Sequence, residues 1–300
     1  MAIIVPPRAT RQRPLPANPP VARRPRSDRP SRVPTVLIVI LLVAVSLFIL
    51  LPVIWMVSAS FRTQGDLVGN PTSLIPQVFT LDNYINVWQR IPFGRQLLNT
   101  IIFAGGTTLA SLLFDSMAAY ALARFNFPGR DVVFILIVVT LMIPIQVTFI
   151  PLYELLADFG WINTFHGLVI PRVADAFGIF FLRQFFLSLP KDLEDAARID
   201  GAGEVRIFAR IMLPLAGPAL LTVAMFTFLA SWNDLLWPLL VATDPQMQTL
   251  PAGLALFKGQ HSSDYGMLMA GAILALLPMI VAFVFVQRRF IEGIATTGMK

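Results

Sequence analysis

Two groups of polar residues stand out in a chain that is otherwise strongly apolar. The first lies in residues 191–214, where five acidic and four basic side chains separate two long apolar runs. The second lies inside apolar runs, where charged, amide and indole side chains occur at 172–175 and 232–237. The first group is suited to contact with a soluble partner, and the second to contact with a polar solute.

The second group can be read in two ways. Arg172 and Asp175 are three residues apart on one helix face, so they could pair with each other or line a pore. Asn233 and Trp237 are four apart on one face, and a sugar ring requires hydroxyl partners together with an aromatic plane. Alternatively, Trp237 anchors the membrane interface and Asn233 bridges helices. The candidate substrate-path residues are Arg172, Asp175, Trp232, Asn233, Asp234 and Trp237.

The first group predicts a rigid lever. Residues 192–200 favour a helix with acids in its first turn, and Gly201 and Gly203 end that helix. A second apolar run at helical spacing follows, formed by Val205, Phe208, Ala209 and Met212. We expect a short helix on the inner face of the membrane, a sharp turn, and a second helix leading into the bilayer. A merely solvated loop is the alternative.

Composition places the chain in a membrane. Of its 300 residues, 56% are hydrophobic and only 13% are charged, about half the charge of a soluble domain. The absence of cysteine excludes disulfides and thiolate metal sites, and two histidines are too few for a metal cluster. The net charge of +6 is not clustered on an aromatic-bearing surface, so nucleic-acid binding is not expected.

Hydropathy predicts an all-α membrane protein with six transmembrane helices. A helix needs about 20 apolar residues to cross the hydrocarbon core. The predicted spans are approximately 35–57, 97–122, 132–151, 167–188, 215–240 and 266–287. The fourth is the weakest, because Arg172 and Asp175 interrupt it. Residues 1–34 are rich in Pro and Arg and are expected to be a disordered cytoplasmic tail, which either anchors the topology or binds anionic lipid.

Positive charge sets the expected orientation. With the N-terminus inside, the inner segments hold 17 Lys and Arg residues and the outer segments hold four. This excess predicts that both termini and the loop at 189–214 are cytoplasmic. The chain has no Gly-x-x-x-x-Gly-Lys-Ser/Thr loop, so ATP would be bound by another subunit.

The loop also carries a family resemblance. Permeases of ABC importers share Glu-Ala-Ala, three residues, Gly, nine residues, and then Ile-x-Leu-Pro. This chain has Asp195-Ala196-Ala197, Gly201 and Ile211-Met212-Leu213-Pro214 at the same spacing. Asp195 replaces the usual glutamate, which implies that the contact with the ATPase subunit is either weaker or shared with Glu194. The implied ATPase-coupling residues are Glu194, Asp195, Ala196, Ala197, Gly201, Ile211, Leu213 and Pro214.

Further segments resemble the carbohydrate, or maltose-type, branch of this family, and in particular its second permease. They are LPVIWMVSASFR, AAYALARFNFPGR, GIFFLRQFF, SWNDLLWPLL and QRRFIEGIATTGMK. The resemblance runs from about residue 35 to residue 300, with a core at about 95–290, and implies the type I importer permease fold. It implies a non-enzymatic subunit without its own cofactor, set in the cytoplasmic membrane.

The resemblance implies a transporter complex that also contains a second six-span permease, two cytoplasmic ATPase subunits and an extracytoplasmic solute-binding protein. A sugar or oligosaccharide is the expected solute, although its identity cannot be read from the sequence. The alternatives are a permease for an amino acid or a phosphorylated polyol, an ion-driven secondary transporter, and a membrane sensor or scaffold. The secondary transporter is disfavoured because the sequence shows no repeated halves.

Overall fold

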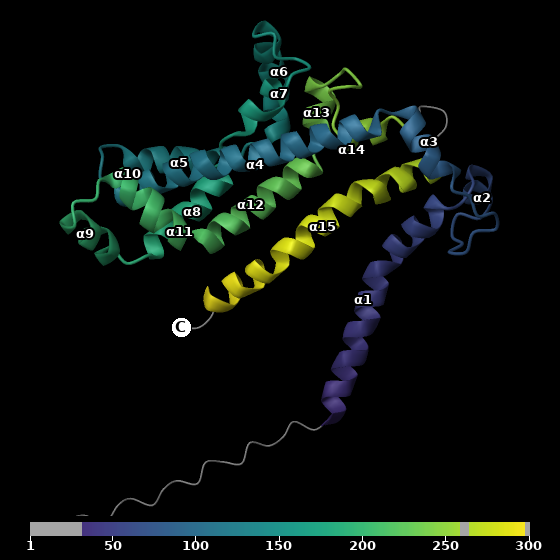
Figure 1. Ribbon diagram of the computed structural model, residues 1–300, viewed down its shortest axis with the longest axis horizontal. Helices are drawn as coiled ribbons and strands as arrows, with labels where there is room; N and C mark the ends of the chain where they lie inside the picture. Colours follow the sequence, from purple (N-terminus) through teal and green to yellow (C-terminus); the bar gives the residue numbers. More distant parts are fainter. Residues whose placement is uncertain (1–31, 259–263, 298–300) are drawn as a thin grey trace, which may run out of the picture. The chain divides into compact units, whose positions relative to one another are not determined.

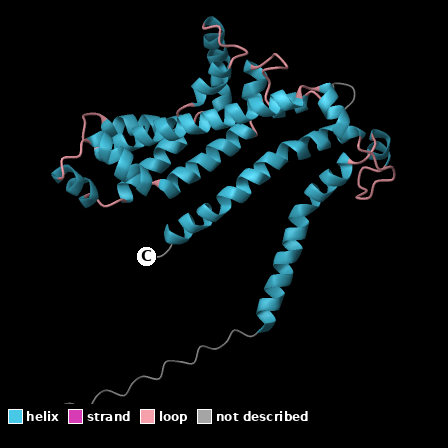
Figure 2. Cartoon of the chain, in the orientation of Figure 1, coloured by secondary structure: helices cyan, strands magenta, loops and turns pink. Residues whose placement is uncertain are grey.

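The computed structural model describes residues 32–258 and 264–297, and every regular element in these ranges is a helix. The chain divides into two compact units, residues 1–50 and residues 51–300. The described part of the first unit is the beginning of helix α1, Arg32–Ser60, and the prediction of a disordered tail falls largely on residues outside the described ranges. Figure 2 shows the helical content, which confirms the all-α prediction.

The second unit contains the end of α1 and all later elements (Figure 1). The first half of the unit comprises α2 Gln64–Gly69, α3 Asp82–Arg90, α4 Phe93–Arg124, α5 Arg130–Thr140, the 3₁₀ turn η1 Ile145–Thr148, α6 Phe149–Asp158, α7 Phe165–Val169 and the 3₁₀ turn η2 Ile170–Arg172. The second half comprises α8 Ala176–Ser188, α9 Asp192–Ile199, α10 Glu204–Ile207, the π-helical turn η3 Phe208–Met212, α11 Leu213–Leu215, α12 Gly217–Trp232, α13 Leu236–Val241, α14 Leu250–Ala255 and α15 Tyr265–Thr297.

Three helices are long and apolar enough to cross a membrane without interruption. They are Val36–Ser60 in α1, the whole of α4, and Tyr265–Val284 in α15. Three further pairs of helices meet the same criterion only when each bent pair is counted as one span, which brings the total to six. The six predicted spans therefore correspond to three continuous helices and three broken ones.

The breaks correct the prediction that spans three and five are continuous. In the third predicted span, α5 ends at Thr140 and the chain turns by 95° before η1 and α6. Pro144 lies at this break, where it lacks an N–H and disfavours helical geometry at the residue before it. In the fifth span, the bent pair turns by 77° between α11 and α12, at Ala216. Helix α12 then ends at Trp232, and Asn233 to Leu235 separate it from α13.

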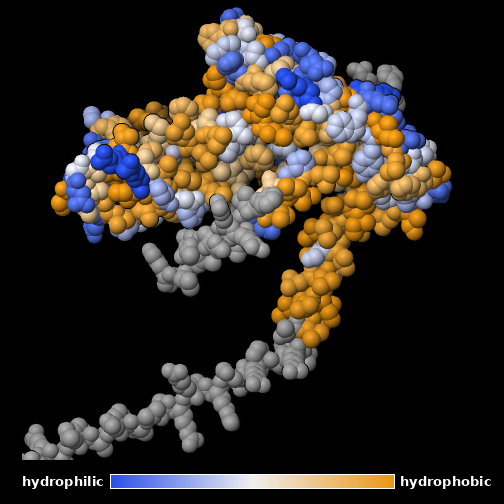
Figure 3. Space-filling view, viewed as in Figure 1, coloured by the Kyte–Doolittle hydropathy of each residue, from blue (hydrophilic) through white to orange (hydrophobic). Residues whose placement is uncertain are grey.

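Three clusters of buried side chains hold the second unit together. One lies among α4, α8, α9, α10, η3 and the start of α12, and includes Phe186, Ile207 and Met212. Another joins α3 and the start of α4 to α14 and α15. The third surrounds Trp237, with Phe103 of α4 and Leu168 of α7. The outer surfaces of these helices remain apolar, and the view in Figure 3 shows hydrophobic residues over much of the second unit. Burial of apolar side chains inside, with an equally apolar exterior, is the pattern expected of a membrane protein.

Candidate functional site

The segment 189–214 folds as predicted, into a short helix, a sharp turn and a second helix. Helix α9 ends at Ile199, and Gly201 follows with φ +79°, a left-handed conformation that favours glycine. The N–H of Ala202 donates to the carbonyl of Ala197 over 2.9 Å, which closes the turn. Figure 1 shows α9 and α10 together at one end of the helices of this unit.

A buried ion pair attaches α9 to the end of α4. Arg124 Nε lies 2.8 Å from Glu194 Oε1, and both side chains are almost completely buried. Neither of these two atoms has an aligned hydrogen bond, so the attraction is that of an ion pair. Arg124 also donates to the carbonyl of Leu189 over 2.8 Å. The orientation of α9 is therefore tied to the last turn of α4.

A second polar network braces the turn itself. Arg198 donates to Glu204 over 2.8 Å and to Asp195 over 2.8 Å, which ties α9 to the start of α10. The hydrogen bond from Arg198 holds the pKa of Glu204 below its usual range, and the same contact raises the pKa of Arg198. Both groups stay charged at neutral pH, so the turn is held closed.

The structure divides the predicted coupling residues into an exposed set and an internal set. Asp195, Ala196, Gly201 and Pro214 are exposed. Ile211 and Leu213 are half-buried, and Ala197 and Glu194 are buried. The idea that Glu194 shares a partner contact with Asp195 is therefore corrected, since its carboxylate is already paired inside the chain. Ala197 packs in the cluster with Phe186 and Ile207 rather than on a partner surface.

Two exposed apolar residues were not singled out as coupling candidates from the sequence. The side chain of Ile199 is 87% exposed and that of Val205 is 82% exposed. Val205 was expected on the same face as Met212, but Met212 is completely buried together with Ile207. The π-helical turn explains this difference, because it adds a residue to one turn and so shifts the buried face by one position. The sequence did hold a signal for Ile199 as a contact residue, because this isoleucine stands among charged loop residues.

The second group of predicted residues meets where two helices are broken. Arg172 ends η2, and its guanidinium forms an ion pair with Asp234, which lies between α12 and α13. The other carboxylate oxygen of Asp234 accepts the N–H of Trp237 over 3.2 Å. The guanidinium also lies 5.6 Å from the centre of the Trp237 ring. Arg172, Asp234 and Trp237 thus form one cluster, although 62 positions separate the two charges.

The predicted pairing of Arg172 with Asp175 is wrong. Asp175 instead accepts the N–H of Gly178 over 3.1 Å and so begins α8. The N–H of Asp175 donates to buried Asp115 of α4 over 2.9 Å, and Asp115 also accepts the hydroxyl of Ser111. A side chain at Gly178 would overlap the carboxylate of Asp115, so glycine permits this close approach of α8 to α4.

The expected aromatic platform for a sugar is not formed. Trp237 is completely buried and donates its indole N–H to the carbonyl of Leu168 over 3.1 Å, so it serves neither as a sugar surface nor as an interface anchor. Trp232 is also buried. Asn233 is exposed, and its amide donates to Leu229 of its own helix rather than bridging two helices. Because α12 ends at Trp232, Asn233 and Trp237 do not share a helix face.

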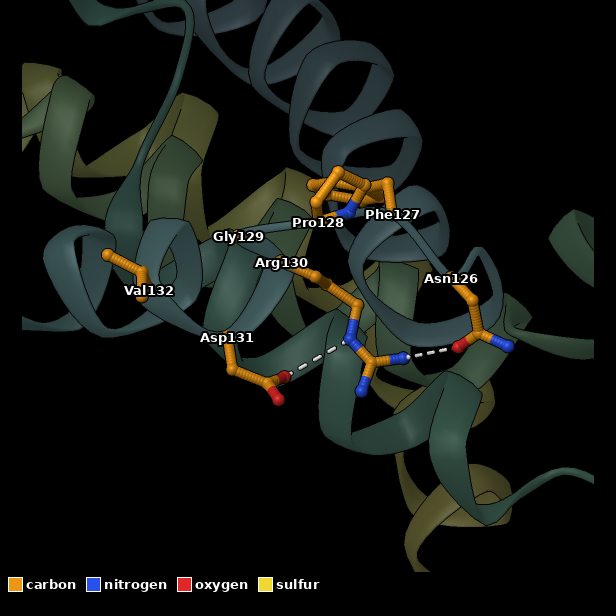
Figure 4. A pocket seen from close by; sticks show the side chains of 7 residues that line it. All are labelled: Asn126, Phe127, Pro128, Gly129, Arg130, Asp131 and Val132. Atoms are coloured by element: carbon orange, nitrogen blue, oxygen red, sulfur yellow. Dashed lines mark hydrogen bonds and ion pairs between the residues drawn. The ribbon is translucent and has the colours of Figure 1, made fainter.

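A hollow of about 480 Å³ lies elsewhere, in the loop between α4 and α5. It is lined by seven consecutive residues, 126–132, and Figure 4 shows Arg130 between Asn126 and Asp131. Arg130 donates to Asn126 over 3.0 Å and to Asp131 over 3.1 Å. This loop follows Arg124, so the hollow belongs to the end of the molecule that carries α9. Among the described residues, His, Asp and Glu form no group of three that could hold a metal ion.

Broken apolar helices joined at a polar cluster, together with a braced helical loop at one end, define a polytopic membrane transport protein. Residues 115–295 match the family of binding-protein-dependent transport system inner membrane components. The chain belongs to this family and is an inner-membrane permease of an ABC importer.

Two curated relatives and one solved structure illustrate this assignment. The arabinooligosaccharides transport system permease protein AraQ of Halalkalibacterium halodurans is 40% identical over 256 residues, covering 83% of this chain and 90% of that protein. The sn-glycerol-3-phosphate transport system permease protein UgpE of Escherichia coli O1:K1 / APEC is 36% identical, with 82% and 90% covered. A bacterial ABC transporter involved in import of the acidic polysaccharide alginate gives a TM-score of 0.74 at 25% identity, with 89% of this chain and 100% of that chain covered.

Proposed function

We propose that this chain is the permease subunit of an ATP-driven importer for a sugar or oligosaccharide. It forms half of the translocation path with a second six-span permease. It couples through residues 189–214 to two cytoplasmic ATPase subunits, which bind the ATP, and it receives solute from an extracytoplasmic binding protein. On this proposal the chain is not an enzyme and carries no cofactor of its own.

The observation that carries the coupling role is the exposed apolar surface of a rigidly held loop. Leu193 is 42% exposed, and Ile199 and Val205 are more exposed still, although charged residues surround them. Exposed apolar side chains of this kind are typical of a protein interaction surface. Because Arg124 and Glu194 fix α9 to α4, a partner that moves α9 also moves α4.

The solute class rests on the relatives. The names of AraQ and of the alginate importer refer to oligosaccharide and polysaccharide, which favours a carbohydrate for this chain. The name of UgpE refers to sn-glycerol 3-phosphate, which keeps a phosphorylated polyol as the second candidate. The cluster at Arg172 and Asp234 lies at helix breaks, and its charges balance each other.

Uptake measurements test this proposal. Cells that lack the chain and cells with it restored would be given labelled arabinooligosaccharides, alginate oligosaccharides and sn-glycerol 3-phosphate. We expect restoration of uptake for a carbohydrate, and loss of that uptake when the ATPase subunit is inactivated. Uptake of sn-glycerol 3-phosphate alone would contradict the sugar assignment, and uptake that survives ATPase inactivation would contradict ATP-driven import.

The proposed orientation has a separate test. The excess of Lys and Arg in the predicted inner segments favours cytoplasmic termini. A cytoplasmic reporter should be active when it is fused after Lys300 and inactive when it is placed near Asn70 or Gln260. An inactive reporter at Lys300 would contradict a cytoplasmic C-terminus.

A further inference from the structure

The stretch between α1 and α3 is unusual for a loop exposed to water. Residues 67–81, LVGNPTSLIPQVFTL, contain no charged side chain in fifteen positions. Several apolar side chains in or just after this stretch are largely exposed: Val68, Ile75, Val78, Phe79, Ile85 and Trp88. Residues 67–81 are called the fold-back segment below. Exposed apolar side chains that lie together in this way are typical of a surface that contacts a membrane or another protein.

The fold-back segment returns alongside the last turns of α1. The indole N–H of Trp55 donates to the carbonyl of Pro71 over 2.9 Å, and the hydroxyl of Ser58 donates to the carbonyl of Leu74 over 2.6 Å. Trp55 and Ser58 belong to the membrane-crossing helix, which ends at Ser60. At a rise of about 1.5 Å per residue, Trp55 lies about 7.5 Å before that end. Pro71 and Leu74 therefore lie at the level of the end of the span.

Irregular backbone at this level must satisfy its polar groups internally. Arg62 supplies hydrogen bonds to this backbone. Its side chain is completely buried, and its guanidinium donates to the carbonyls of Asp66, Asn70 and Ser73 at 2.8–3.0 Å. The same guanidinium binds the carboxylate of Asp66 with two bonds of 2.8 Å. The guanidinium thus pairs three backbone carbonyl groups of the turn and neutralises the charge of the Asp66 carboxylate.

Several backbone donors of the fold-back segment are also paired within the chain. The N–H of Ile75 donates to the Ser73 hydroxyl, that of Gln77 to the Asp66 carboxylate, and that of Thr80 to the carbonyl of Phe61. Phe79 stacks on Phe61, with ring centres 5.1 Å apart. Several backbone polar groups are thus paired within the chain, while most of the apolar side chains remain exposed.

Helix α3 continues this arrangement. Its Asn83 and Val87 are buried, and Val87 lies in the cluster with Met267 of α15. Ile85 and Trp88 are exposed. Tryptophan is enriched where a membrane meets water, because its ring is apolar and its N–H is polar. The segment therefore follows the membrane-crossing helix α1 in the chain, and α3 packs against the membrane-crossing helix α15.

From these contacts we propose that residues 67–88 form an interfacial membrane element. The fold-back segment and the exposed side of α3 lie in the lipid headgroup region at the end of α1, with apolar side chains directed at the acyl chains. Phospholipid is thus the partner of this surface, and Arg62 is the residue that makes the fold-back segment compatible with it. The proposal depends on the membrane location of the chain and is independent of its solute.

Site-directed fluorescence tests this proposal directly, because the natural chain has no cysteine. Ile75→Cys would be labelled with an environment-sensitive dye in the full chain, purified with its partner subunits and placed in vesicles of phosphatidylethanolamine and phosphatidylglycerol. Iodide reports water access, and lipids with a spin label near the headgroup or near the chain end report depth. Gln246→Cys is the control for an exposed loop, and Phe48→Cys, at the centre of the span Val36–Ser60, is the control for mid-span lipid contact.

For Ile75→Cys we expect blue-shifted emission, weak quenching by iodide, and stronger quenching by the shallow lipid label than by the deep one. Phe48→Cys should show the reverse depth preference, and Gln246→Cys should be quenched mainly by iodide. Iodide quenching at position 75 equal to that at position 246 would place the segment in water and overturn the proposal. Protection from iodide and from both lipid labels would mean that a protein subunit covers the segment, which would overturn it equally.

Discussion

The guanidinium of Arg172 lies 2.5 Å from the carboxylate of Asp234, and this ion pair joins two helix breaks that are 62 positions apart in the chain. Arg172 closes the turn before α8, and Asp234 lies between α12 and α13. Since Asp234 also accepts the N–H of Trp237, the pair holds α13 and its buried indole in place. The cluster is therefore a structural junction in the membrane-crossing part of the chain.

Replacement of Asp234 tests that role. Asp234→Asn and Asp234→Ala should both lower the yield of assembled complex, and to similar extents, because both leave Arg172 without a counter-charge. Breaking a fully buried pair costs about 3–5 kcal/mol, and the partial exposure of these two side chains places the expected cost below that range. Complex yield and solute uptake should be measured together. The exchange variant Arg172→Asp with Asp234→Arg should recover part of the yield. Normal assembly and uptake in Asp234→Asn, with loss only in Asp234→Ala, would show a hydroxyl-binding role instead.

The pair of Arg124 and Glu194 predicts a difference between two neighbouring acids. Glu194→Gln leaves the buried guanidinium of Arg124 unpaired, a change that typically costs about 3–5 kcal/mol. Hydrogen exchange across residues 192–207 should therefore become faster, and ATPase co-purification should fall. Asp195→Asn removes an exposed pair with Arg198, which contributes about 1 kcal/mol at most. Its exchange rates should stay close to wild type, and any loss of ATPase binding would then report a direct contact. Equal acceleration of exchange in both variants would contradict the division into a positioning residue and a contact residue.

The turn after α9 offers a matched pair of glycines. Gly201 has φ +79°, whereas Gly203 has φ −75°, and no atom would crowd a side chain at either position. Gly201→Ala should destabilise the turn by about 1–2 kcal/mol, the cost of a left-handed conformation for an ordinary residue. Gly203→Ala has no such cost. Hydrogen exchange of the α9 amides measures the effect, and equal protection in the two variants would show that the turn does not depend on the conformation of Gly201.

The buried Arg62 predicts resistance of the fold-back segment to acid. Its hydrogen bonds lower the pKa of Asp66 to about 2, well below the usual value near 3.9. Stabilisation by the ionised carboxylate is therefore complete above about pH 4 and is lost only as the pH falls through about 2. The difference in unfolding temperature between wild type and Asp66→Asn should stay constant from pH 7 to pH 4.5. A decline of that difference centred above pH 4 would show that Arg62 does not control this carboxyl group.

The class of structure, the approximate positions of the membrane segments, and the helix–turn–helix form of residues 189–214 could be predicted from the amino-acid sequence. These features depend on local information: apolar length, charge in the first helical turn, and glycine at a left-handed position. The breaks within spans three and five were missed because hydropathy averages over a window and does not register a bend. Pro144 marks one of these bends, but proline also occurs inside α1 and α15 without ending them.

The pairing of the polar side chains could not be predicted in this way, because it depends on how the helices pack. From spacing alone Arg172 could pair with Asp175, three residues away, yet Asp175 begins α8 and Asp234 approaches from a distant helix break. Likewise Glu194 and Asp195 are adjacent acids of equal charge, and only the packing of α9 on α4 buries one and exposes the other. Charge partners are chosen by distance in space, and distance in space depends on the packing of all the helices together.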